Sequence, residues 1–98
     1  MFIEMKRIVV EKGTSQPLID KFSKAEMVKQ APGYVEHKVL KRVRNSENEE
    51  IIVQFVWESQ EAFTNWKKSD AHKAGHANKG SKASNVIESS MDTYTVEN

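Results

Sequence analysis

The sequence predicts one α+β domain with a ferredoxin-like sheet, built in the order strand, helix, strand, strand, helix, strand (βαββαβ). Three observations carry this prediction. Four segments alternate or concentrate apolar residues as strands do, and two segments place them at helical spacing. A polar stretch between the second and third strand segments indicates a hairpin that joins two βαβ-like halves. In 98 residues this gives a single domain, residues 1–98, with both helices on one face of the sheet.

The first half begins with a strand over residues 2–10. Alternation places one set of side chains on one face, namely Phe2, Glu4, Lys6, Ile8 and Val10. The other face receives Ile3, Met5, Arg7 and Val9. Ser15 is the expected N-cap of the first helix, with Pro17 in its first turn. The helical face comprises Leu18, Ile19, Phe22 and Ala25, continued by Met27 and Val28, and the Ala-Pro-Gly run at 31–33 ends the helix.

The second half repeats the pattern. Residues 34–43 alternate as a strand, 44–49 form a polar hairpin loop, and 51–57 are apolar enough for a central strand. Ser59 is the expected N-cap of the second helix, with Glu61 in its acidic first turn. Residues 67–85 contain no large apolar side chain, and residues 85–97 supply the last strand. The tract at 67–85 therefore has too little apolar surface to anchor itself.

A sheet with both helices on one face leaves its other face open. Here that face carries Ile3, Met5 and Val9, which are costly to leave in water. We therefore expect a second copy to cover it, giving a homodimer of the dimeric α+β barrel type.

Composition narrows the function. A formal net charge of +1 gives no electrostatic reason to expect nucleic acid or an anionic membrane as partner. No apolar run approaches the roughly 20 residues that a membrane span requires. The absence of cysteine excludes disulfides, thiolate metal ligands and cysteine nucleophiles. With no signal-peptide pattern in residues 1–30, a cytoplasmic location is the expectation.

The segment 57–76 holds the candidate site. Phe63 and Trp66 share a helical face, and His72 and His76 follow at the i, i+4 spacing that places two imidazoles together. Taken separately, Trp66 is an ordinary core residue and the histidines are solvated, and His37 has no evident reason to join them. Taken together, an aromatic helix face before a histidine-bearing, poorly anchored tract favours a large flat apolar ligand with histidine bound to its iron.

The run V-W-E-S-Q-E-A-F-T-N-W-K-K-S-D-A-H-K-A-G-H closely resembles the IsdG-type haem-degrading monooxygenases, which belong to the antibiotic biosynthesis monooxygenase (ABM) group. The E-K-G after the first strand and the P-G-Y before the second extend the resemblance along the chain. It implies haem as substrate and cofactor, consumed with O2 and electrons from a separate reductase. It further implies His76 as axial iron ligand, Trp66 pressed against the porphyrin, and His72 as a bystander. Phe22 and Phe63 are the other expected haem-binding residues.

The sequence departs from that family at one position. The family has a functional asparagine in the first strand, where this chain has Lys6. Lys6 has three alternative roles: a hydrogen bond to O2, a haem propionate partner at the pocket mouth, or no role, with Arg7 facing inward instead. We favour the propionate. Two other functions stay open, a haem-binding or sensing protein without turnover and a cofactor-free ABM-type monooxygenase acting on a polycyclic phenol or quinol.

Overall fold

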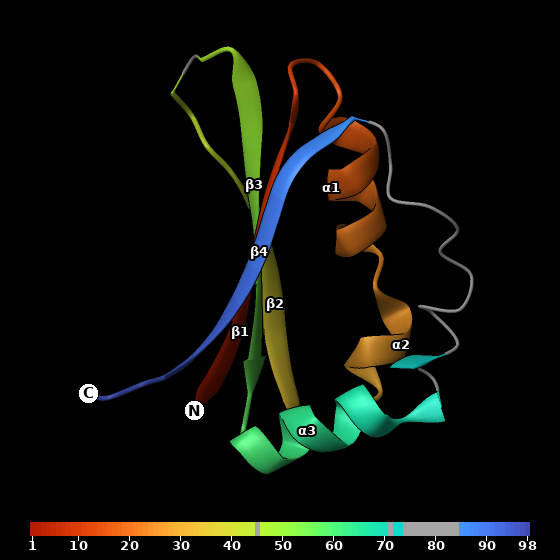
Figure 1. Ribbon diagram of the computed structural model, residues 1–98. Helices are drawn as coiled ribbons and strands as arrows, with labels where there is room; N and C mark the ends of the chain where they lie inside the picture. The colour runs from red at the N-terminus through yellow and green to blue at the C-terminus, as the bar shows by residue number, and fades with distance from the viewer. Residues whose placement is uncertain (45, 71, 74–84) are drawn as a thin grey trace.

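A four-stranded antiparallel sheet organises the molecule, as the computed structural model of the chain shows (Figure 1). The structure describes residues 1–44, 46–70, 72–73 and 85–98. The strands are β1 (Phe2–Glu11), β2 (Tyr34–Lys41), β3 (Asn48–Trp57) and β4 (Val86–Thr95). Their order across the sheet is β2-β3-β1-β4, so β1 and β3 are central and β2 and β4 lie at the edges. This is the predicted ferredoxin-like arrangement.

The helices α1 (Gln16–Ser23), α2 (Glu26–Lys29) and α3 (Gln60–Lys68) all lie on one side of the sheet (Figure 1). The prediction of one continuous helix through Met27 and Val28 is wrong. Ala25 leaves the helical region, with φ −68° and ψ 73°, and a separate short helix begins after it. The change of direction brings Val28 into the core, where it is 5% exposed. Burial of that side chain outweighs the continuity of a marginal helix.

Ser15 and Ser59 both precede helices, but only Ser59 caps with its side chain. Ser59 is extended, and its Oγ accepts a hydrogen bond from the backbone N–H of Ala62 at 3.2 Å. Ser15 has helical φ and ψ and makes no side-chain cap. Its backbone N–H instead donates to Glu49 Oε1 at 3.1 Å. The start of α1 is therefore fixed by a carboxylate from β3, which also accepts from the N–H of Gly13 at 2.9 Å.

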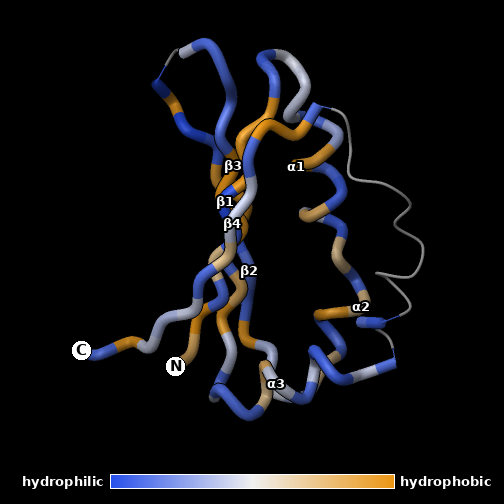
Figure 2. The backbone as a smooth tube through the Cα atoms, in the orientation of Figure 1, coloured by the Kyte–Doolittle hydropathy of each residue, from blue (hydrophilic) through white to orange (hydrophobic). Residues whose placement is uncertain are grey.

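The core lies between the helices and the inner faces of β1 and β3. Figure 2 shows apolar residues concentrated along these central strands and in parts of α1 and α2. The inner face of β3 is the driest part, since Ile51, Val53 and Trp57 are fully buried. The remaining members of the cluster are Phe2, Val28, Phe55 and Phe63. The predicted central position of residues 51–57 is confirmed by pairing to both β1 and β2.

Gly33 sets how closely α3 approaches β2. Its φ is +86°, a left-handed conformation that favours glycine. A Cβ at this position would lie 2.4 Å from the Cβ of Ala62, which is closer than real contacts allow. The carbonyl of Gly33 also accepts from the N–H of Glu58 at 2.8 Å. Gly33 thus permits the contact that places α3, with Trp66, across one end of the sheet.

The face of the sheet away from the helices is uncovered by any described element (Figure 1). The strand register places Ile3, Met5 and Val9 there, beside Ile52 and Val56 of β3. This is the apolar face that the sequence predicts. None of the described helices has the length and apolar character that a membrane crossing requires.

Candidate functional site

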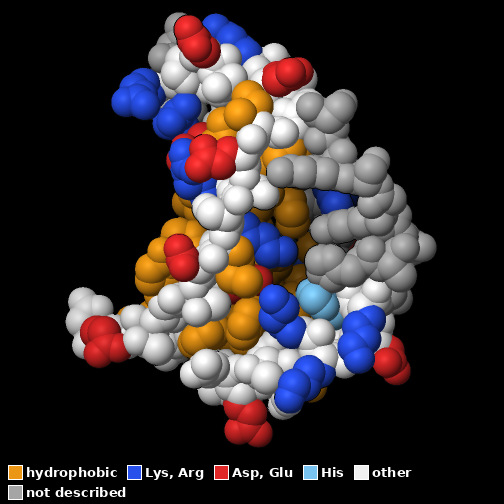
Figure 3. All heavy atoms as spheres, in the orientation of Figure 1, with side chains coloured by type: hydrophobic (Ala, Val, Ile, Leu, Met, Phe, Trp, Pro, Cys, Tyr) orange, Lys and Arg blue, Asp and Glu red, His pale blue; other side chains and the backbone are white. Residues whose placement is uncertain are grey.

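A hollow lies between α1 and the paired strands β1 and β4. Two cavities follow one another along it, of about 520 Å³ and about 320 Å³. The larger is lined by Val10, Gly13, Thr14, Pro17, Leu18, Lys21, Asn85 and Val86. The smaller is lined by Lys6, Ile8, Phe22, Ser89, Ser90 and Met91. We call these two cavities together the hollow. Figure 3 shows apolar side chains exposed in this region with cationic side chains among them.

Lys6 points into the hollow from β1. Its Nζ lies 5.6 Å from the ring centroid of Phe22 on α1 and 5.9 Å from that of Phe55 on β3. Both rings present electron-rich faces that attract an ammonium group. The strand is not rotated, so the alternative in which Arg7 faces inward is wrong. The predicted residues Lys6 and Phe22 are thus brought together in one cavity.

Glu4 is the functional candidate that the sequence analysis missed. Its residue is 6% exposed, on the inner face of β1 between Phe2 and Lys6. Burial raises the pKa of its carboxyl, against the opposing attraction of Lys6 and Lys67. Among the described residues, Glu4 makes no hydrogen bond or ion pair. The available signal was the alternation itself, which places an acid in the middle of a face destined for burial.

Trp66 closes one end of this inner surface. Its indole stacks on Trp57 with ring centroids 6.4 Å apart and 29° between the planes. Phe63 packs behind, 6.2 Å from Trp57 and 5.1 Å from Phe2. Phe63 is 8% exposed and belongs to the core, whereas Trp66 is half-buried and keeps a free surface. We call Trp57, Phe63 and Trp66 the aromatic wall.

The aromatic wall contains an unusual donor. Trp57 is fully buried, and its Nε1–H has no hydrogen-bond partner in the described part of the chain. An unpaired buried donor is costly, so such groups are rare in folded proteins.

The three histidines have different positions. His76, the predicted iron ligand, lies outside the described residues. His72 is half-buried, and its ring meets the Trp66 indole edge-on at 5.5 Å. His37 is on β2, stacked on Phe55 at 5.2 Å. Within residues 1–44, 46–70, 72–73 and 85–98 there is no group of three potential metal-binding side chains.

His37 joins β2 to the end of α1. Its Nε2 donates to the carbonyl of Phe22 at 3.1 Å, so its Nδ1 accepts the hydrogen bond of the Tyr34 hydroxyl at 2.6 Å. Desolvation raises the pKa of the Tyr34 hydroxyl, which keeps it a donor. Both ring nitrogens of His37 are thus occupied. Its role is to hold α1, and with it Phe22, over the sheet.

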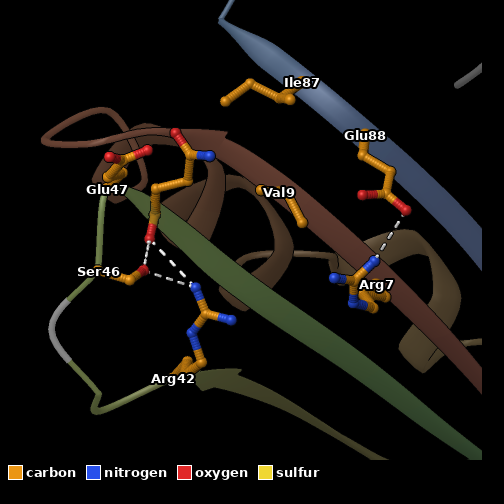
Figure 4. A pocket seen from close by; sticks show the side chains of 8 residues that line it. Arg7, Val9, Arg42, Ser46, Glu47, Ile87 and Glu88 are labelled. Carbon is orange, nitrogen blue, oxygen red and sulfur yellow. Dashed lines mark hydrogen bonds and ion pairs between the residues drawn. The ribbon is translucent and has the colours of Figure 1, made fainter.

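A second hollow, on the opposite face of the sheet, differs in its electrostatics. It encloses about 380 Å³ near the β2–β3 hairpin, between Arg7 and Arg42 (Figure 4). Arg7 donates to Glu50 at 3.0 Å and to Glu88 at 3.1 Å. Arg42 donates to Ser46 Oγ at 2.8 Å and to the carbonyl of Asn48 at 3.3 Å. Arg42 Nε is buried and has no partner among the described residues, but the other guanidinium nitrogens of Arg7 and Arg42 are engaged. This hollow is therefore a poorer anion site than the one beside Lys6.

Sequence comparison adds the family. The pattern of the antibiotic biosynthesis monooxygenases matches residues 1–78, so the chain belongs to that family. A similar relative is the haem-degrading monooxygenase HmoA of Bacillus subtilis (strain 168), which is 34% identical in an alignment that covers 98% of this chain and 91% of HmoA. Another is the staphylobilin-producing haem oxygenase of Staphylococcus haemolyticus (strain JCSC1435), which is 35% identical in an alignment that covers 98% of this chain and 95% of that enzyme.

Solved structures agree with the fold. An antibiotic biosynthesis monooxygenase family protein from Bacillus cereus superposes with a TM-score of 0.88 at 30% identity, covering 99% of this chain and 93% of that one. The haem-degrader MhuD from Mycobacterium tuberculosis, with two haems bound in its active site, superposes with a TM-score of 0.76 at 27% identity. That match covers 98% of this chain and 95% of MhuD.

Proposed function

We propose that this protein is a haem-degrading monooxygenase that binds haem in the hollow and opens the porphyrin ring with O2, releasing iron. Electrons come from a separate reductase. The proposal draws on family membership and on relatives, about one third identical, that are named for haem degradation. It also draws on the chemistry of this chain's own inner surface.

The observation that carries the proposal is the pairing of Lys6 with aromatic rings in one hollow. A porphyrin offers a flat apolar body with two carboxylates at one edge. The lining of the hollow supplies Phe22, Lys6 and Lys21, and Lys21 Nζ lies 5.7 Å from the Phe22 centroid. The buried ring of Phe55 lies 5.9 Å from Lys6 Nζ. The residues present therefore suit haem.

In this proposal His76 is the axial iron ligand, and the iron of the bound haem supplies the O2-activating chemistry. Trp66, backed by Trp57 at 6.4 Å, presses its indole against the porphyrin and bends it. Phe22 contacts the ring from α1, while Phe63 supports Trp66 from the core. Lys6 pairs with a propionate because a solvated ion pair at the mouth avoids most of the desolvation cost.

We further propose that the active form is a homodimer. The open face presents the half-buried side chains of Ile3 and Met5 beside those of Ile52 and Val56, and Val9 on the same face is already buried. Pairing this face with its copy removes the apolar surface from water. Light scattering at micromolar concentration should give twice the monomer mass, and a stable monomer would contradict this assembly.

Haem titration tests the binding site. Adding haem should produce a shifted Soret band, which His76→Ala should abolish and His72→Ala should leave nearly intact. These two residues form a matched pair, since both are histidines of the same segment. If the effects were reversed, the axial ligand would be His72. If no Soret shift formed with the native chain, a cofactor-free monooxygenase would be favoured.

Turnover is a separate measurement. With reductant in air, the Soret band should decay as the porphyrin opens. Trp66→Phe should bind haem but degrade it slowly, because a smaller ring bends the porphyrin less. A stably folded Trp66→Ala variant that degraded haem at the native rate would rule out the bending role. A Soret band that stayed stable in reductant and air would indicate binding or sensing without turnover.

A further inference from the structure

Two cations act on Glu4, which has no hydrogen-bond or ion-pair partner in the described part of the chain. Its neighbours across the sheet are Phe55 on β3 and Thr93 on β4, neither of which carries charge. The charged groups acting on it in the described part of the chain are Lys6 on β1 and Lys67 on α3. Neither ammonium group lies within ion-pair distance of the carboxyl, so the charge of Glu4 is balanced only at a distance.

Both lysines also lie on aromatic rings. Lys6 Nζ is over Phe22 and Phe55, and Lys67 Nζ is 5.5 Å from the Phe63 centroid. Neither ammonium group has an ion pair within the described residues. A carboxylate that entered the hollow would find Lys6 lining the cavity, with no ion pair in that part of the chain. Such a ligand would compete with Glu4 for the same counter-charge.

The consequence follows from elementary electrostatics. Once a ligand carboxylate pairs with Lys6, Glu4 loses part of its compensation and gains a negative neighbour. Glu4 is 6% exposed, so solvent screens these charges weakly. Both changes disfavour the charged form of Glu4.

We propose that Glu4 takes up one proton when a carboxylate-bearing tetrapyrrole binds in the hollow, so that the closed site contains a neutral carboxylic acid. The proposal rests on the proposed function for the class of ligand. An O–H bond forms on the carboxyl, the proton comes from solvent, and nothing is oxidised or reduced. The proton is then held on a buried carboxyl two residues before Lys6 on the same face of β1.

Proton counting tests this inference directly. Haem is titrated into the protein by calorimetry at pH 7 in two buffers of different ionisation enthalpy, which gives the number of protons bound. The native chain should take up more protons than Glu4→Gln, with one proton per site as the upper bound. Its affinity should fall by up to about tenfold per pH unit over the range in which free Glu4 is ionised and bound Glu4 is not, whereas Glu4→Gln should lose that slope.

Three controls keep the result specific. Glu58→Gln removes an exposed carboxyl directly after β3 and should take up as many protons on binding haem as the native chain does. Lys6→Met removes the counter-charge before binding, so Glu4 is already protonated to a greater extent and the uptake should shrink. Haem dimethyl ester cannot pair with Lys6, so it should cause less uptake than haem.

The outcomes separate the two proposals. A Soret shift without a difference in proton uptake between the native chain and Glu4→Gln overturns this inference and leaves haem binding standing. Equal uptake with haem and its dimethyl ester overturns the competition for Lys6. Failure of the native chain to bind haem overturns both. Melting temperatures measured alongside show that each variant is folded.

Discussion

Charged side chains near the β2–β3 hairpin are engaged in ion pairs to a greater extent than those in the hollow. Lys6 and Arg7 are consecutive in sequence but point to opposite faces of β1. Arg7 is bonded to Glu50 and Glu88, and Glu50 also lies 3.4 Å from Arg42. Within the residues that the structure describes, Lys6 has no ion pair: its Nζ lies over two aromatic rings, and the carboxyl of Glu4 acts on it from a greater distance. The outer face engages most of its charged groups, whereas the inner face leaves Lys6 available.

The carboxyls of Glu49 and Glu4 show the same contrast. Glu49 is bonded to Lys41 Nζ at 2.9 Å and to the N–H groups of Gly13 and Ser15. The lysine and these donors lower its pKa to about 2. Glu4, which has no hydrogen bond or ion pair among the described residues, has a raised pKa because burial dominates. Paired charges here fix the positions of α1 and the hairpin, while unpaired charges mark the surface that we propose for the ligand.

The largest expected effect contrasts the two faces of β3. Phe55 is 6% exposed beneath Lys6, and Ile52 lies on the open face. Phe55→Ala should lower the free energy of unfolding by about 3–5 kcal/mol, because it leaves a cavity in the core and removes the ring under Lys6. Ile52→Ala should cost far less in the isolated chain but weaken self-association. Urea unfolding measures the free energy of unfolding of each variant, and light scattering measures its self-association. Equal losses of stability in Phe55→Ala and Ile52→Ala would contradict the assignment of inner and outer faces.

The second prediction uses pH. Glu49 has a folded pKa below its unfolded value, so its contribution to stability is full above about pH 4.5 and is lost as pH falls towards 2. Glu49→Gln should therefore be less stable than the native chain at neutral pH, with the difference vanishing in acid. Glu4 has the opposite sign, since its stabilising contribution is present below its unfolded pKa of about 4.5 and lost as pH rises through the raised folded value.

Glu4→Gln should accordingly gain stability over the native chain as pH rises from 4.5 to 7. Thermal melting of the three proteins across this range checks both signs. A Glu4→Gln variant that lost stability at neutral pH would show that the carboxylate has a direct partner in the folded chain.

The smallest expected effect compares Lys6 with Arg7. Lys6→Ala should weaken haem affinity about fivefold, equivalent to about 1 kcal/mol for a solvated ion pair, while bound haem still turns over. Arg7→Ala should leave affinity unchanged. The Lys6→Asn variant tests whether residue 6 instead donates a hydrogen bond to O2. Unchanged affinity with turnover lost in Lys6→Ala and restored in Lys6→Asn would contradict the propionate role and establish one facing O2.

The sequence alone is enough to predict the four strands, the positions of α1 and α3, and the faces of the first strand. Alternation in residues 2–10 is enough to place Phe2 and Ile8 inward and Ile3 and Met5 outward, because strand side chains have a period of two. The cap at Ser59 and the turn at Gly33 follow from local chemistry, since an extended serine can accept a nearby N–H and only glycine tolerates that φ without strain. These features depend on residues close together in the chain.

Tertiary structure decided what depends on distant residues. Ser15 and Ser59 look alike in sequence, but Glu49 holds the N–H of Ser15 and replaces its side-chain cap. The first helix ends before Ala25 because the change of direction there allows Val28 to be buried in the core. The surroundings of Glu4 come from β1, β3, β4 and α3. Its burial and the charges acting on it depend on all of these elements together. No local pattern encodes this combination, because electrostatic and packing energies depend on distance in space and not along the chain.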